Sequence, residues 1–219
     1  MNLKAIGALC KKRALFNVWD DNYQNQTSQW LGVAGAMYLL PDLPYLNNTH
    51  IANIFDVTDV KSEAETVEKK RSKVTINIDE FPSALCGYNT DRGEMQLKND
   101  EIIITHGEWT VKPFTTSGGT EFIDIEFIKP IANYGVWLEF YERRSKNGNI
   151  YIVAKNGLEI LAIIMPLRIN EEMIVIMEKM AIEARATIAR AKEAEERRAR
   201  ELMAGGQLTL TEGENNENN

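Results

Sequence analysis

Histidine and cysteine, the side chains most often used for catalysis and metal binding, are scarce in this sequence. The only histidines are His50 and His106, and the only cysteines are Cys10 and Cys86. A histidine-based triad or a multi-histidine metal centre is therefore nearly excluded. The cysteines form no CxxC pair and have no nearby histidine, which argues against a zinc site or a disulfide framework. We predict two buried free thiols, no metal, no cofactor and no catalytic residue, so the protein is not expected to be an enzyme.

Long apolar runs and a signal-peptide pattern are also missing. No segment holds the roughly 18 consecutive apolar residues that a membrane span needs. Residues 1–13 do not follow the order of basic region, apolar stretch and cleavage site that marks a signal peptide. We therefore expect a cytoplasmic protein without membrane contact. The formal net charge of −7 opposes general adhesion to nucleic acid but is compatible with a local basic strip.

The segments that are present predict an α+β protein. Residues 73–168 read almost entirely as strands, which predicts a mainly antiparallel β body. Short helices are expected at 2–12, 49–57 and 125–133. Asn147-Gly148 predicts a tight type I′ hairpin, because both central residues of that turn need positive φ. The expected organisation is a β-rich domain over 1–170, a long helix over 171–203 and a disordered acidic tail over 204–219.

Two parts of the body repeat the same order of elements. Residues 2–41 predict a helix and three strands that end at Pro41, and residues 125–166 predict the same series ending at Pro166. In both, the last strand follows a glycine, Gly35 or Gly157. This pattern predicts an internal helix-plus-three-strand repeat.

The C-terminal helix carries one apolar stripe in an otherwise charged segment. Residues 171–203 would span about 50 Å at 1.5 Å per residue. Spacings of three and four residues, as in a coiled-coil seam, relate the members of the stripe. We expect it to cover the body, hold a partner or make the protein oligomerise, and we expect Gly205-Gly206 to end the helix. The stripe consists of Met173, Ile176, Met177, Met180, Ala184, Ile188 and Ala191.

Positive charge is concentrated on the first helix, which carries Lys4, Lys11 and Lys12 and is followed by Arg13. Facing a phosphate backbone, these side chains would provide salt-sensitive, sequence-independent attraction. The alternative is a solvated helix face whose lysines aid solubility. Four tryptophans, Trp19, Trp30, Trp109 and Trp137, fall in predicted strands, where packing is favoured over base stacking.

The β body resembles DNA sliding clamps. The segments that carry the resemblance are residues 107–131 and 135–169, in which a short helix leads into meander strands and a final strand ending Met165-Pro166-Leu167-Arg168. The resemblance covers about residues 1–170 and implies helices that line a DNA channel, so that Lys4, Lys11, Lys12, Arg13 and Lys129 would face DNA. Asp124 and Glu126 on the second helix depart from that pattern. The opening residues and the tail are also similar to small proteins of bacteriophages and prophages.

The tail offers one further resemblance. Gln207, Leu208 and Leu210 resemble the extended peptide by which bacterial replication proteins dock on a sliding clamp, although Thr211 stands where that motif has an aromatic residue. The sequence thus leaves two hypotheses. The first is a non-enzymatic, clamp-like DNA replication factor of a phage. The second is a structural or interaction protein that oligomerises through its C-terminal helix.

Overall fold

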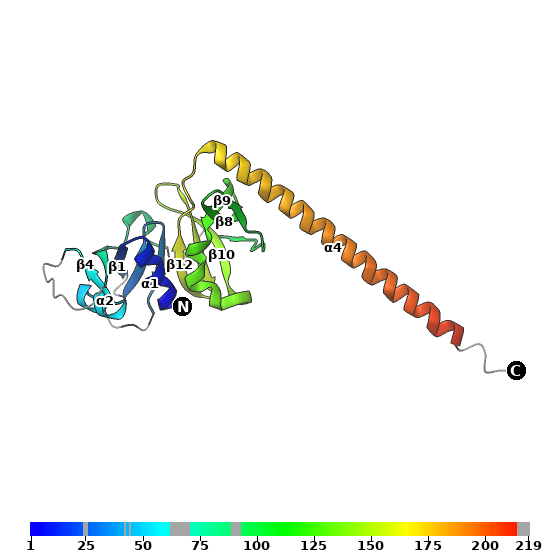
Figure 1. Cartoon of the computed structure of the whole chain (residues 1–219), viewed down its shortest axis with the longest axis horizontal. Coiled ribbons are helices and arrows are strands. Elements are labelled where there is room, and N and C mark those ends of the chain that lie inside the picture. The colour runs from blue at the N-terminus through cyan, green and yellow to red at the C-terminus, as the bar shows by residue number, and fades with distance from the viewer. Residues whose placement is uncertain (24–25, 42, 44, 62–70, 89–92, 214–219) are drawn as a thin grey trace. The chain divides into compact units, whose positions relative to one another are not determined.

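We describe the protein from a computed structural model, which covers residues 1–23, 26–41, 43, 45–61, 71–88 and 93–213, with backbone alone at 23, 26–27 and 204–213. The chain divides into two compact units, Met1–Arg168 and Ile169–Asn219. The first unit, called the body below, contains every strand of the described residues, and the second contains the long helix α4 (Figure 1). The mixed content of helix and largely antiparallel strand confirms the predicted α+β class.

A nine-stranded sheet forms the framework of the body, in the order β4-β5-β1-β2-β3-β12-β11-β10-β6. Most neighbours are antiparallel, but β1 pairs with β5, and β4 with β5, in parallel. A separate antiparallel sheet has the order β7-β8-β9. The strands are β1 (Leu15–Tyr23), β2 (Gln26–Val33), β3 (Ala36–Leu39), β4 (Val57–Asp59), β5 (Ser72–Glu80), β6 (Met95–Leu97), β7 (Ile104–His106), β8 (Trp109–Thr116), β9 (Gly119–Asp124), β10 (Glu139–Arg144), β11 (Ile150–Asn156) and β12 (Glu159–Ile164).

The predicted repeat appears as two three-strand meanders that meet in the centre of the large sheet. Strands β1-β2-β3 form one meander and β10-β11-β12 the other, each with antiparallel neighbours. They join through β3 and β12, where Tyr38 lies opposite Ala162. A helical segment precedes each meander: α1 (Leu3–Lys12) in the first, and α3 (Ile125–Ile128) with the 3₁₀ helix η2 (Lys129–Trp137) in the second.

Helix α1 begins as the sequence predicts. Asn2 caps it, since the side chain accepts a hydrogen bond from the Ala5 amide at 3.1 Å. Its buried face holds Ile6, Leu9 and Cys10, and the Cys10 thiol donates to the Gly32 carbonyl at 3.5 Å. In Figure 1, α1 and α2 (Asn48–Ile54) lie near β1 and β4.

The second helical segment differs from the predicted helix over 125–133. It is a single α-turn followed by 3₁₀ helix, and the path breaks at Gly135, whose φ of 56° lies outside helical geometry. Pro130 lies at the start of η2 and has no amide to donate, which limits continuation of the α-helix. Trp137 ends η2 and is 72% exposed, so the prediction that it packs in a strand is wrong.

The β10–β11 connection also differs from its prediction. Arg144 pairs with Ile150, which leaves a loop over 145–149 instead of a two-residue turn. Gly148 has a φ of 80°, but Asn147 does not adopt positive φ, so no type I′ turn forms. The loop is closed by hydrogen bonds from the Ser145 amide to the Asn149 carbonyl and from the Gly148 amide to the Ser145 carbonyl.

Apolar side chains fill both faces of the large sheet. One core combines α1, α2, α3 and η2 with the β7-β8-β9 sheet, and the ring pair Phe114–Phe140, at 4.8 Å, joins the two sheets. The opposite face holds a smaller core in which Trp30 packs against Phe81 and Tyr88. Segment 81–88, including η1 (Ser83–Leu85), therefore covers that face.

The long helix α4 spans Glu171–Gly213. Asn170 caps it, since its side chain accepts a hydrogen bond from the Met173 amide at 2.8 Å. The helix extends past the expected end at residue 203, through Gly205-Gly206 to Gly213. Each glycine in a helix costs only about 1 kcal/mol relative to alanine. Residues 214–219 lie outside the described residues.

Candidate functional site

Of the basic residues predicted to face DNA, the structure brings Lys12, Arg13 and Lys129 together with Asp124 and Glu126. Lys4 and Lys11 lie on the same helix, α1. We call these seven residues the α1–α3 surface. The start of α1 is tied to η2, because the Asn2 amide donates to the Pro130 carbonyl at 2.9 Å. The terminal amino group of Met1 also donates to the Tyr134 hydroxyl at 2.9 Å. The internal repeat thus brings the two helical segments together.

Two carboxylates from the second half neutralise much of this positive charge. Arg13 forms an ion pair with Asp124 at 3.1 Å. Glu126 lies 2.6 Å from Lys129 and 3.8 Å from Lys12. The hydrogen bond from Lys129, followed by the charges of the neighbouring cations, lowers the pKa of Glu126. Asp124 and Glu126 therefore act as partners of the basic residues.

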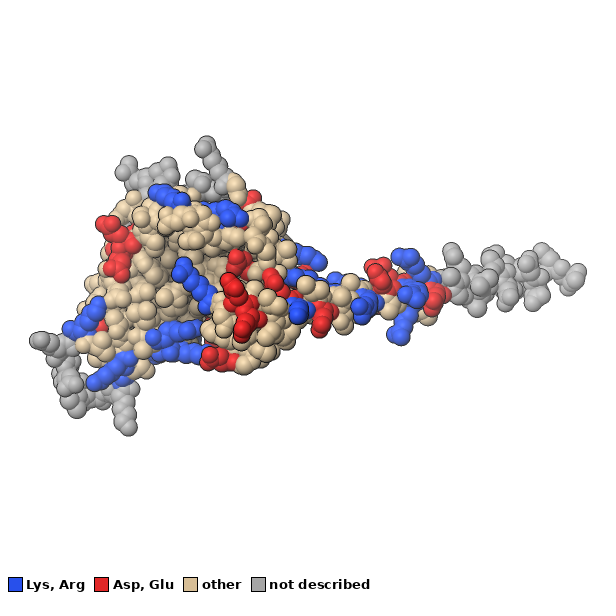
Figure 2. All heavy atoms as spheres, turned by 90° about the horizontal axis from the view of Figure 1, so that it is seen from above, with Lys and Arg blue, Asp and Glu red and all other residues tan. Residues whose placement is uncertain are grey.

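Lys4 and Lys11 are the two exposed cations of this surface that form no ion pair with any described residue. Lys11 and Lys12 also lie in the last turn of α1, where positive charge stabilises the helix dipole. Figure 2 shows one face of the protein, on which several Lys and Arg side chains lie close together at the lower left and acidic side chains lie elsewhere. Because Lys12, Arg13 and Lys129 are paired with carboxylates, the α1–α3 surface is less positive than the sequence alone suggests.

The histidines have structural positions. His50 completes a capping box at the start of α2: its amide donates to the Asn47 side chain at 2.9 Å, and the Asn47 amide donates to His50 Nδ1 at 3.4 Å. His106 lies at the end of β7 and pairs with Trp109 across the hairpin. No group of three metal-ligating side chains occurs among the described residues.

The cysteine prediction is half wrong. Cys10 is fully buried, and burial raises the pKa of its thiol to about 12. Cys86 is exposed, because it follows the short η1 helix at the surface of the segment that covers the smaller core. Both thiols are free.

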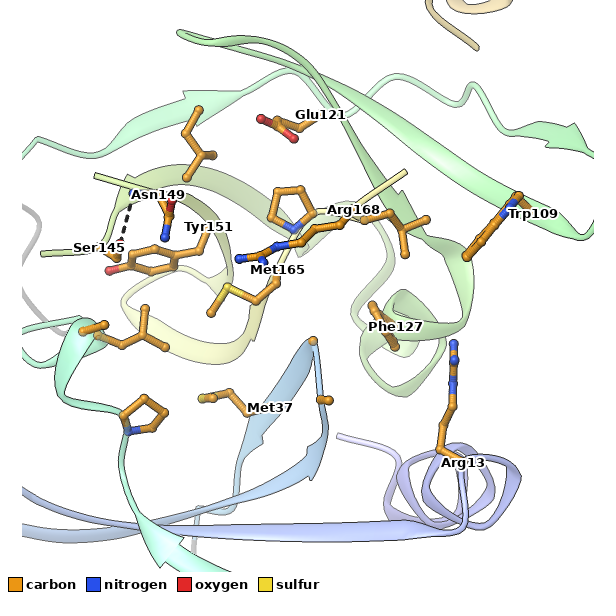
Figure 3. A pocket seen from close by; sticks show the side chains of 18 residues that line it. Arg13, Met37, Trp109, Glu121, Phe127, Ser145, Asn149, Tyr151, Met165 and Arg168 are labelled. Atoms are coloured by element: carbon orange, nitrogen blue, oxygen red, sulfur yellow. Dashed lines mark hydrogen bonds between the residues drawn. The ribbon is translucent and has the colours of Figure 1, made fainter. Parts of the chain in front are cut away.

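The body contains a pocket of about 690 Å³ at one end of the central strands. The β2–β3 turn, the end of β12 and the β10–β11 loop meet there, with Trp109 at the start of β8 and Phe127 from α3. Figure 3 shows Arg13 pointing toward Phe127 and Trp109, and Arg168 extending toward Tyr151 and Met165. The sequence analysis did not predict this site, because its lining comes from segments far apart in the chain.

Charge in the pocket is divided between two arginines and one acid. Arg13 is paired with Asp124 and lies 5.9 Å from the centre of the Phe127 ring. Arg168 is exposed and forms no ion pair with a described residue. Glu121 lies on another wall (Figure 3), and burial, followed by the negative charge of Glu142, raises its pKa. The free positive charge of the pocket is therefore on Arg168.

The apolar stripe of α4 is continuous on the helix. Met173, Met177, Met180 and Ala184 follow one another at alternating steps of four and three residues, as the seam of a coiled coil requires. Ile176 and Ile188 flank this seam. Gln207, Leu208 and Leu210 lie within the α4 span and not in an extended peptide, and their side chains lie outside the described ones.

Comparison with known proteins gives no assignment: no family model, no curated protein and no solved structure matches the chain. Among the described helices, none is both long and apolar enough to cross a membrane.

Proposed function

We propose that this chain is a non-enzymatic protein that binds other macromolecules and associates with further copies of itself through α4. The observation that carries the proposal is the apolar seam of Met173, Met177, Met180 and Ala184 on a helix of 43 residues. Such a helix is about 65 Å long at 1.5 Å per residue. Met177 in this seam is fully buried, but Ile176 and Ile188 of the stripe are 42% and 40% exposed. We expect another helix to cover these exposed apolar side chains, because contiguous apolar surface is unfavourable in water.

Sedimentation equilibrium of the full chain tests this proposal. We expect a mass that is a multiple of the 24.9 kDa chain, and we expect Ile188→Glu to shift it toward the monomer, because a charge would enter the exposed part of the apolar stripe. Arg190→Glu, outside the stripe and two residues away, is the control and should leave the mass unchanged. A monomer at concentrations of tens of micromolar, or an oligomer indifferent to Ile188→Glu, would refute self-association through α4.

A clamp-like role in DNA replication is the second candidate. The two helix-plus-three-strand halves and the adjacent helices α1 and η2 favour it. The mixed charge of the α1–α3 surface leaves Lys4 and Lys11 as its principal phosphate-binding side chains.

Titration of labelled duplex DNA at several salt concentrations tests the second candidate. We expect the double variant Lys4→Glu, Lys11→Glu to abolish binding, and Glu126→Gln to strengthen it by releasing Lys12 and Lys129. Each phosphate neutralised contributes about 0.9 to the slope of log K against log salt. Two results together would rule this role out: DNA binding that does not change with salt concentration, and a double variant that binds DNA as tightly as the control Lys146→Glu.

A further inference from the structure

The pocket at the end of the central strands combines side-chain types that are enriched in protein–protein interfaces. Three are aromatic, two are methionines and two are arginines: Trp109, Phe127, Tyr151, Met37, Met165, Arg13 and Arg168. Aromatic residues, methionine and arginine are the residues over-represented at the cores of such interfaces. We propose that this pocket binds a short peptide segment of a partner protein, in which a bulky apolar side chain lies next to an acidic one.

The apolar part of the ligand follows from the floor of the pocket. Met37 and Tyr151 belong to the smaller core, and Met165 packs against that core. Their inner atoms are held by the fold, and their outer surfaces line the pocket. Methionine side chains adapt to ligands of different shape, which suits an apolar anchor supplied by a peptide. The volume of about 690 Å³ lies within the range of ligand pockets, about 300–1,000 Å³.

The acidic part of the ligand follows from Arg168. Its guanidinium extends over the pocket toward Tyr151 and Met165 (Figure 3) and has no ion-pair partner among the described residues. A planar guanidinium binds a carboxylate through two parallel hydrogen bonds. Arg13 stays paired with Asp124, and its guanidinium lies over the Phe127 ring, 5.9 Å from the ring centre. The acidic side chain of the peptide therefore lies against Arg168 and away from Glu121.

This inference stands on the body alone and does not depend on self-association through α4. The probe is a phage-displayed library of random dodecapeptides, panned against the immobilised full chain. We expect a consensus in which an aspartate or glutamate lies beside a leucine, methionine or aromatic residue. A fluorescein-labelled synthetic peptide of that consensus is then titrated with the full chain by fluorescence anisotropy.

Two variants and a matched control locate the site. Arg168→Glu should weaken binding of the peptide by about tenfold or more, because it replaces the partner of the acid with a like charge. Met165→Ala should weaken binding by about fivefold, because it removes apolar contact area. Lys4→Glu makes the same charge change on an exposed residue that does not line the pocket, and it should alter the affinity by less than twofold. An unchanged tryptophan emission spectrum shows that each variant is folded.

Three results would overturn the proposal. The first is a library that yields no consensus, or one without acidic residues. The second is a peptide whose affinity is the same for the wild-type chain, Arg168→Glu and Met165→Ala. The third is an oligomeric mass that falls in Arg168→Glu, which would assign the pocket to contact with a second copy of this chain.

Discussion

Glu94 lies between two buried cations on the face of the sheet formed by β10 and β11. Its carboxylate lies 2.8 Å from Arg143 Nε and 2.7 Å from Lys155 Nζ. The two cationic side chains are only 4% and 6% exposed, and that of Glu94 is 12% exposed. Removing one partner of a buried ion pair costs about 3–5 kcal/mol, since a charge is then left in a poorly solvated site. Both cations have further interactions, so we expect Glu94→Gln to cost about 3 kcal/mol.

Tryptophan fluorescence during urea unfolding measures this cost in the body alone, because all four tryptophans lie within residues 1–168. In a chain of this size, 3 kcal/mol corresponds to a fall in Tm of about 6–12 °C. Glu108→Gln, in the exposed β7–β8 turn, is the matched control and should stay within about 0.5 kcal/mol. Adding Lys155→Met to Glu94→Gln should recover part of the loss. A cost below about 1 kcal/mol for Glu94→Gln would show that the negative charge of Glu94 is not needed to stabilise the buried Arg143 and Lys155.

Three further predictions concern the body. Gly7→Ala should destabilise the body by about 1–2 kcal/mol in urea unfolding, because the new Cβ would lie 2.5 Å from Phe55 Cδ1. Adding Phe55→Leu should restore stability. A single variant more stable than the wild type would contradict this packing. Maleimide at pH 8 should label only Cys86, as mass spectrometry of the native chain would show, because burial raises the pKa of Cys10 to about 12. Since that pKa is raised from 9.0, the stability contributed by the neutral thiol should persist below about pH 9 and decline as pH approaches 12. Two adducts on native protein would refute this. Asn47→Ala should cost about 1 kcal/mol by removing the cap of α2, whereas the exposed neighbour Asn53→Ala should have almost no effect.

Some local signals in the sequence predicted local structure well, although the type I′ turn expected at Asn147-Gly148 does not form. The cap at Asn2 and the apolar spacing of Ile6, Leu9 and Cys10 predicted α1 within one residue of its observed start. The order of elements and the repeated glycine before the last strand predicted the two meanders. These features depend on neighbours within a few residues, so their causes are visible in the sequence.

Features that depend on distant segments were missed. The parallel pairing of β1 with β5 joins strands separated by β2, β3, α2 and β4, and no spacing in the sequence indicates it. The ion pairs of Arg13 with Asp124 and of Lys12 with Glu126 arise from the contact between the two halves. Asp124 and Glu126 were recognised as a departure from a basic helix, but their partners were not. The lining of the pocket comes from segments far apart in the chain. Nothing in the sequence therefore marked Arg168 as a residue of a binding site.

The pairing of β3 with β12 has a consequence for synthesis of the chain. Strand β3 leaves the ribosome early, but its neighbour β12 is almost the last part of the body to be made. At about 5–20 residues per second, the edge of β3 waits on the order of ten seconds for its partner. An unpaired sheet edge readily pairs with other strands. Nascent chains that end before Glu159 should therefore aggregate or recruit chaperones, whereas chains released after Arg168 should already contain a closed body.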